Sequence, residues 1–165
     1  MVLDLPILLR DGVILAILES AWIIAALRYN PRLFLQYYPK EIREAAPPLR
    51  PYERMTGRVI GLPFLVLLMA VPIYSTVTFA QRHADADFLA CTVHGFGVSM
   101  IFNTVDLLVL DLLWLGTLRP NWAMIPGTEH VRVHFNYGHH FRGFAVGTML
   151  SLIVGGIAAA AASGL

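Results

Sequence analysis

The sequence predicts an all-α integral membrane protein, a four-transmembrane-helix bundle with both termini on the non-cytoplasmic side. Of its 165 residues, 57% are hydrophobic and 14% are charged, and the mean hydropathy is +0.64. An ordinary globular chain has about 25% charged residues, and a soluble fold with so few would expose large apolar patches. Besides this composition, three long charge-free stretches and the placement of the basic residues support the prediction.

The charge-free stretches are Val59–Phe79, Phe88–Val105 and Gly143–Leu165. They meet or approach the roughly 20 residues that a helix needs to cross the hydrocarbon layer. The first helix is less clear, because its apolar run contains Glu19. We expect a single transmembrane domain, residues 1–165, with helices over about 12–28, 57–80, 88–117 and 141–163.

The basic residues lie mainly in two long connectors, residues 29–56 and 118–140. Ten of the twelve lysines and arginines lie in these connectors or within two residues of them. The positive-inside rule therefore places both connectors in the cytoplasm. We expect the chain in a bacterial inner (cytoplasmic) membrane. A formal net charge of +1 gives no reason to expect a nucleic acid partner.

The first connector is expected to lie against the lipid bilayer. It contains five of the ten prolines, so it cannot form one continuous helix. Tyr29 and Tyr37 interleave with Arg28 and Arg32, and aromatic rings with basic side chains are typical of the membrane interface. The connector is either a link that follows the membrane surface or a docking surface for a lipid substrate.

The fourth helix carries small residues at every fourth position. Such a series lets another helix backbone approach closely. The partner is either another helix of this chain or a second subunit, so a homo- or hetero-oligomer is one expectation. The series consists of Gly143, Gly147, Ser151, Gly155, Ala159 and Ser163.

The third helix carries a polar stripe that should face the bundle interior, because polar side chains are costly against lipid. We expect His94, opposite this stripe, to be a hydrogen-bonded packing residue. Glu19 is an intramembrane carboxylate and therefore a functional candidate, expected nearer the outer half of the membrane. The stripe consists of Thr92, Ser99, Asn103 and Asp106.

Four residues at the cytoplasmic end of the third and fourth helices are candidate metal ligands. Asp106 and Asp111 lie near the end of the third helix, Glu129 lies in the second connector, and His140 lies at the start of the fourth helix. Carboxylate and imidazole groups are ligands of first-row metals. We expect a divalent metal ion held by these four side chains, and an acid–base site without metal is an alternative.

Two histidines of the second connector are candidate proton carriers in catalysis. Thr128 follows a Pro-Gly turn signal and is expected to cap a short helix. That helix would place His130 and His134 one turn apart on the same face. In a purely structural alternative, the two aspartates only form ion pairs with nearby arginines, and these histidines are solvated.

Residues 103–111, Pro126–Glu129 and Tyr137–Gly143 together resemble a family of small, uncharacterised bacterial multi-spanning membrane proteins. The resemblance covers about forty residues, from the third helix to the start of the fourth. It implies no activity. It favours the two aspartates, Glu129 and His140 as site residues over the connector's other histidines.

The first expectation for function is a small membrane enzyme that acts on a lipid-like or other apolar substrate. A second is a non-catalytic subunit that docks through the small residues of the fourth helix. A third is a small proton- or cation-coupled transporter that uses Glu19 and the polar stripe. The sequence contains no P-loop and no GxGxxG, GxSxG or HExxH motif, which argues against nucleotide hydrolysis and Rossmann-type hydride transfer.

Overall fold

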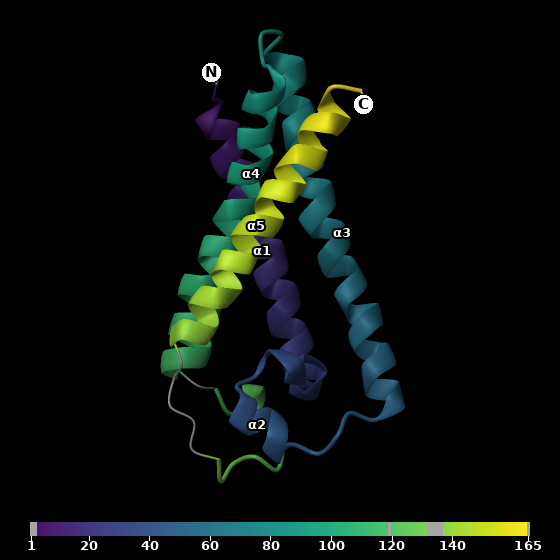
Figure 1. Ribbon diagram of the computed structural model, residues 1–165, viewed down its shortest axis with the longest axis vertical. Helices are drawn as coiled ribbons and strands as arrows, with labels where there is room; N and C mark the ends of the chain where they lie inside the picture. Colours follow the sequence, from purple (N-terminus) through teal and green to yellow (C-terminus); the bar gives the residue numbers. More distant parts are fainter. Residues whose placement is uncertain (1–2, 119, 132–136, 165) are drawn as a thin grey trace.

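The computed structural model describes residues 3–118, 120–131 and 137–164, and the regular structure in these residues is entirely helical. Figure 1 shows the start of α1 and the end of α5 at the end of the bundle where α3 turns into α4, with the two long connectors at the opposite end. The long described segments are α1 (Leu5–Tyr29), α3 (Pro51–Arg82), α4 (Phe88–Val105) with its continuation η2 (Asp106–Leu118), and α5 (Tyr137–Ala162).

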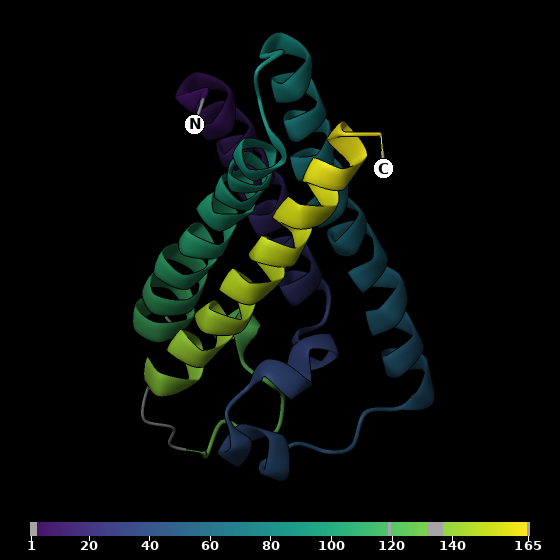
Figure 2. The same cartoon turned by 45° about the horizontal axis from the view of Figure 1, so that its top comes forward.

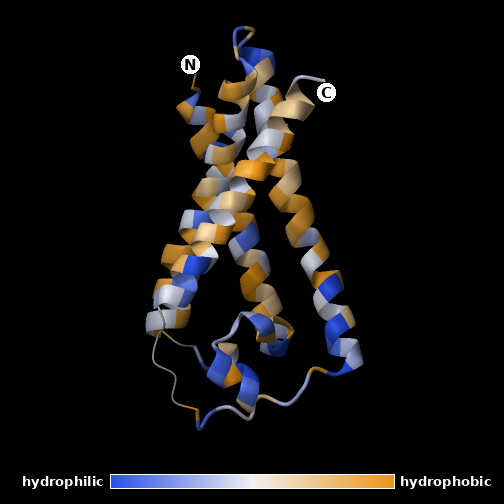
Figure 3. Cartoon of the chain, viewed as in Figure 1, coloured by the Kyte–Doolittle hydropathy of each residue, from blue (hydrophilic) through white to orange (hydrophobic). Residues whose placement is uncertain are grey.

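Three helices in the described part of the chain are long and apolar enough to cross a membrane. They are Pro51–Arg82, Phe88–Leu118 and Tyr137–Ala162. The chain therefore has the character of an integral membrane protein. Figure 3 shows many apolar residues along these helices, and Leu62 and Met149 are among their large exposed side chains.

Helix α1 is not among these three. It begins at Leu5 rather than near residue 12, since the Asp4 side chain caps it by accepting a hydrogen bond from the Ile7 N–H (3.2 Å). The additional turns bring Arg10 and Asp11 into the helix. The helix therefore includes two charged residues that precede the start expected from the sequence.

Helix α3 begins at Pro51 rather than near residue 57. The Glu53 carboxylate accepts a hydrogen bond from the Arg50 N–H (2.7 Å), which satisfies a free donor at the helix start. The helix continues through Pro63 and Pro72 to Arg82. Because α3 is this long, its first turns reach the connector region, as Figure 1 shows.

Beyond Val105 the third predicted helix continues without a break but changes its hydrogen-bonding pattern. Residues Asp106–Leu118 form η2, a π-helix, the form whose characteristic hydrogen bond joins a backbone N–H to the carbonyl five residues earlier. The sequence pattern predicted an ordinary α-helix to about residue 117. This change in hydrogen bonding alters which side chains of residues 106–118 lie on the same face of the helix.

Helix α4 lies at the centre of the bundle and contacts α1, α3 and α5. Figure 2 shows α5 lying along α4. A Cβ atom added at Gly155 would lie 2.6 Å from the Thr92 carbonyl oxygen, and one at Gly147 would collide with the Asn103 side chain. Ser151 is buried on the same face. The small-residue series is therefore used within the chain, whereas Gly143 faces open space.

The connectors form a small apolar core of their own at one end of the bundle. The first contains η1 (Pro31–Tyr37) and α2 (Lys40–Ala45), and the second contains η3 (Asn121–Ala123). Ile125 of the second connector packs against Leu35 of the first. Two connectors separated by the whole of α3 and α4 are thereby held together.

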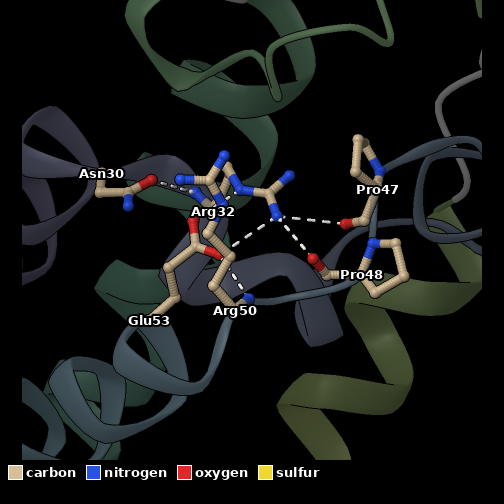
Figure 4. Close-up of polar contacts among 6 residues, drawn as sticks. All are labelled: Asn30, Arg32, Pro47, Pro48, Arg50 and Glu53. Atoms are coloured by element: carbon tan, nitrogen blue, oxygen red, sulfur yellow. Dashed lines mark hydrogen bonds and ion pairs between the residues drawn. The ribbon is translucent and has the colours of Figure 1, made fainter.

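An ion pair ties the first connector to the start of α3. The Arg32 guanidinium contacts both carboxylate oxygens of Glu53, at 2.7 and 3.2 Å, and also donates to the carbonyls of Pro47 and Pro48 at 3.1 Å. Figure 4 shows these groups converging on Arg32. Glu53 is 3% exposed and Arg32 15% exposed at the side chain, so the pair is largely withdrawn from water.

Candidate functional site

An aspartate–histidine pair lies where η2 and the start of α5 meet. The Nδ1 atom of His140 lies 2.9 Å from Oδ2 of Asp111. The side chains are 15% and 25% exposed respectively, so the pair is partly shielded from solvent but reachable. A carboxylate in this position favours the tautomer with the proton on Nδ1, which leaves Nε2 as the basic nitrogen.

The π-helical backbone places Asp106 on the same side as this pair. Residues five apart in an α-helix are separated by about 140° around the axis. In a π-helix, a hydrogen bond joins residues five apart, which therefore lie nearer the same side of the helix than they do in an α-helix. The half-buried Asp106 carboxyl accordingly lies within electrostatic range of both Asp111 and His140.

Glu19 lies closer to this group than we expected from the sequence. Its side chain is fully buried, and neither carboxylate oxygen has a hydrogen-bond partner among the described residues. The carboxyl is within electrostatic range of Asp106. Three helical segments, α1, η2 and α5, therefore contribute titratable groups to one region of the bundle.

Glu129 and His130 are exposed residues of the second connector. The Glu129 carboxylate accepts a hydrogen bond from the Gly127 N–H (2.9 Å), and this bond holds the pKa of Glu129 below its usual value. Gly127 has a positive φ of 86°, as the turn requires. The Glu129 hydrogen bond is thus a local contact of this turn.

The short helix predicted to begin at Thr128 is wrong. Residues 128–131 form a turn, and the Thr128 hydroxyl donates to the Ile125 carbonyl (2.8 Å) instead of capping a helix. A capping hydroxyl would accept a hydrogen bond from an N–H two or three residues later, whereas the Thr128 hydroxyl bonds to a residue before it. His134 lies outside the described residues, so its predicted pairing with His130 is untested.

No group of three or more His, Cys, Asp or Glu side chains in the described ranges is arranged to hold a metal ion. Asp106, Asp111 and His140 are neighbours, and Asp111 already contacts the His140 imidazole. Such a carboxylate–histidine contact is also how proteins orient a ligand histidine. The divalent metal at these residues and Glu129 therefore stays a prediction.

The polar stripe of α4 lies largely inside the bundle. Asn103 donates to the Phe144 carbonyl (3.1 Å) and to the Thr148 hydroxyl (3.2 Å) of α5, and the Ser99 hydroxyl donates to the Gly95 carbonyl (3.0 Å) of its own helix. Ser99 and Asn103 are buried, whereas Thr92 is half-buried. Of these residues, Asn103 joins α4 to α5.

The surroundings of the pair are built from the connectors. The His139 ring nitrogen Nε2 lies 3.0 Å from the Tyr37 carbonyl oxygen, which joins the start of α5 to η1. The Arg28 guanidinium lies over the Trp122 ring, 5.1 Å from its centroid. Aromatic and basic side chains therefore lie at this end of the bundle, as expected for a membrane interface.

Comparison with known protein families, curated proteins and solved structures gives no match for this chain. The site must therefore be interpreted from its own geometry.

Asp11, a buried residue of α1, was not predicted from the sequence. It lies near His94, which is fully buried, bonded to Ser75 and stacked on Phe79 with 4.5 Å between ring centroids. The missed signal was the helix cap at Asp4, which would have placed Asp11 in the first helix, eight residues before Glu19. The expectation that His94 is a hydrogen-bonded buried residue agrees with this arrangement.

Proposed function

We propose that α1 is a fourth transmembrane helix, with both termini on the non-cytoplasmic side of a bacterial inner membrane. Helix α1 packs against α3 and α4, which are themselves able to cross a membrane. Its inward face carries Asp11 and Glu19, both buried, so lipid does not have to solvate those carboxylates. The basic connectors at the opposite end from both termini support the orientation.

We propose that the protein is a membrane enzyme with an acid–base site formed by Asp111 and His140. The observation that carries this proposal is the 2.9 Å contact between the His140 Nδ1 atom and the Asp111 carboxylate. The carboxylate would hold the imidazole in the tautomer that leaves Nε2 as the basic nitrogen. His140 would then take a proton from the substrate at Nε2, with Asp106 close enough to influence that proton transfer.

The location of the pair supports a lipid-like substrate. His140 lies near the end of membrane-spanning helices, and its neighbour His139 contacts the connector that carries Tyr37. An amphipathic molecule in the bilayer could place its polar head at this level, with its chains along the apolar outer faces of α5 and η2. Metal-assisted chemistry at the same residues is the alternative form of this proposal.

Removal of either member of the pair should abolish turnover. The full chain would be reconstituted into vesicles of phosphatidylethanolamine and phosphatidylglycerol, and changes in the lipids followed by mass spectrometry. We expect His140→Gln and Asp111→Asn to slow product formation by about a hundredfold or more, because each removes the oriented base. Wild-type protein that leaves every vesicle lipid unchanged, or a fully active His140→Gln variant, would contradict the proposal.

Two control variants separate the versions of this proposal. His130→Gln should retain full turnover, because His130 is exposed on the connector and lies outside the pair. Glu129→Gln separates the two kinds of chemistry. If Glu129 is a metal ligand, this variant should lose its activity and also its bound metal, which elemental analysis would measure. It should be silent if the pair works without metal.

A second candidate function is transport of protons or cations, supported by the buried carboxylate of Glu19. Both of its oxygens lack a hydrogen-bond partner in the described part of the chain, and Asp106 lies within electrostatic range. A carboxylate in that position is costly unless it binds a proton or a cation.

Replacement of Glu19 tests the transport function. We expect Glu19→Gln to abolish ion flux into proteoliposomes, measured with a pH-sensitive dye and with sodium or potassium gradients. Glu129→Gln, which changes an exposed carboxylate, should leave that flux unchanged. Equal flux in wild type and Glu19→Gln would remove the support for a transporter.

A further inference from the structure

A second group of polar side chains meets inside the opposite half of the bundle, where the chain begins and ends. Asp11 of α1, Ser75 of α3 and His94 of α4 come from three different helices. Ser75 and His94 are fully buried, and Asp11 is 6% exposed. Polar groups are rarely sealed among membrane helices without a function, because each must be compensated there.

The Ser75 hydroxyl lies between the other two groups. Its Oγ atom is 2.9 Å from the Nε2 atom of His94, and the Asp11 carboxylate interacts with both Ser75 and the His94 imidazole. A hydroxyl can donate one proton and accept another at the same time. Ser75 can therefore bond to the histidine while it faces the carboxylate.

Three buried polar atoms near this group have no hydrogen-bond partner among the described residues. They are Oδ2 of Asp11, Oγ1 of Thr76 and Nδ1 of His94. A buried donor or acceptor without a partner is costly. The unpaired Oδ2 of Asp11 is an oxygen that can take up a proton. On the ring, a proton on the unpaired Nδ1 leaves Nε2, which faces Ser75, as the nitrogen that accepts another.

The group is connected to the surface on one side. The Arg10 Nε atom lies 2.7 Å from Asp11 Oδ1, and the Arg10 side chain is 54% exposed. This cation favours the ionised form of Asp11. The Asp11 carboxylate is also within electrostatic range of the His94 imidazole.

The other titratable groups that face His94 also lie at this end. Asp4 and His83 are within electrostatic range of His94 and bond to each other, with 3.1 Å between Oδ2 and Nε2. From α5, the buried methyl group of Ala158 packs at this level. The nearest charges around the ring are therefore the two aspartates and His83.

We propose that Asp11, Ser75 and His94 form a proton relay, in which His94 is reversibly protonated through the Ser75 hydroxyl. A proton that reaches Asp11 is passed to Ser75 Oγ while the original Ser75 proton moves to His94 Nε2. The carboxylate is ionised again, the hydroxyl still carries one proton, and the ring becomes an imidazolium. The ligand of this site is the proton itself, and the site does not depend on Asp111, His140 or Glu19.

The relay can be followed by nitrogen NMR of the histidine rings in the full chain, reconstituted into lipid bilayers. The His94 signals are assigned as those missing from His94→Gln. We expect the ring to change its protonation state between about pH 5 and about pH 8, and its N–H to exchange with solvent deuterium. Ser75→Ala should slow this exchange by at least about tenfold, because the hydroxyl bridge is lost.

Ser99→Ala is the matched control. Ser99 is also buried, but its hydroxyl donates only to a carbonyl of its own helix, so exchange at His94 should be unchanged. Asp11→Asn keeps the shape of the side chain and should slow the exchange as Ser75→Ala does. It tests the same relay if Ser75→Ala does not fold. A His94 ring that keeps one neutral tautomer and does not exchange would overturn the relay. So would equal exchange in wild type and Asp11→Asn.

Discussion

Replacing Gly155 with alanine is expected to lower the free energy of unfolding by about 1–3 kcal/mol. The added Cβ would lie 2.6 Å from the Thr92 carbonyl oxygen and 2.8 Å from the Phe96 backbone nitrogen. Both are backbone atoms, so no rotation of a side chain can relieve the contact. Helices α4 and α5 would have to separate, and each would lose packing along its length.

Gly156→Ala is the control for this prediction, because no heavy atom lies within 4 Å of a Cβ at that position. Gly156→Ala raises the helix propensity of α5 by the same amount as Gly155→Ala, one residue further along the helix. We would measure unfolding of both variants in mixed micelles by circular dichroism. Equal stability of the two variants would show that α4 and α5 do not pack through Gly155.

Glu53→Gln is expected to destabilise the connector end of the bundle by about 3 kcal/mol. The substitution leaves the shape of the side chain but removes the charge opposite Arg32, whose guanidinium contacts both oxygens of the carboxylate. The Glu53 side chain is 3% exposed, so water cannot easily replace the lost ion pair. Protease cleavage in residues 38–50 should become faster, because the Arg32 contacts hold this segment.

The exposed pair Lys40–Glu44 provides the matched control. Its side chains are 73% and 68% exposed, with 3.7 Å between nitrogen and oxygen. Glu44→Gln should change stability by less than about 0.5 kcal/mol, because water screens a surface pair. If Glu53→Gln were as mild as Glu44→Gln, the Arg32 network would contribute little to the position of the connector.

The helical segments could be predicted because length and apolarity decide whether a segment can cross a membrane. Three of the four expected segments are helices with these properties in the structure. The start of α1 could not be placed by hydropathy, because it depends on one hydrogen bond from the Ile7 N–H to Asp4. The small-residue series of α5 predicted close packing, but only the structure shows that α4 of the same chain occupies it at Gly147 and Gly155.

The candidate site was only partly predictable, because its geometry depends on how distant segments meet. Asp106, Asp111 and His140 were grouped from their depth in the expected helices; in the structure Asp111 contacts His140, and Asp106 is within electrostatic range of both. Glu129 was grouped with them from its place in the sequence, and its observed hydrogen bond is to the Gly127 turn instead. Connector residues have no repeating pattern from which their direction can be inferred.

The sequence by itself determined that this chain is helical and suited to a membrane, since composition and charge-free length depend on no tertiary contact. It also identified most of the polar residues inside the bundle, because such residues are costly in lipid. Only the tertiary structure decided which of them meet. Asp106 and Asp111 lie in a π-helix, within electrostatic range of each other, and helix packing brings Asp11, Ser75 and His94 together from three helices. Such contacts depend on backbone hydrogen bonding and on the rotation of each helix about its axis, which a single sequence pattern does not specify.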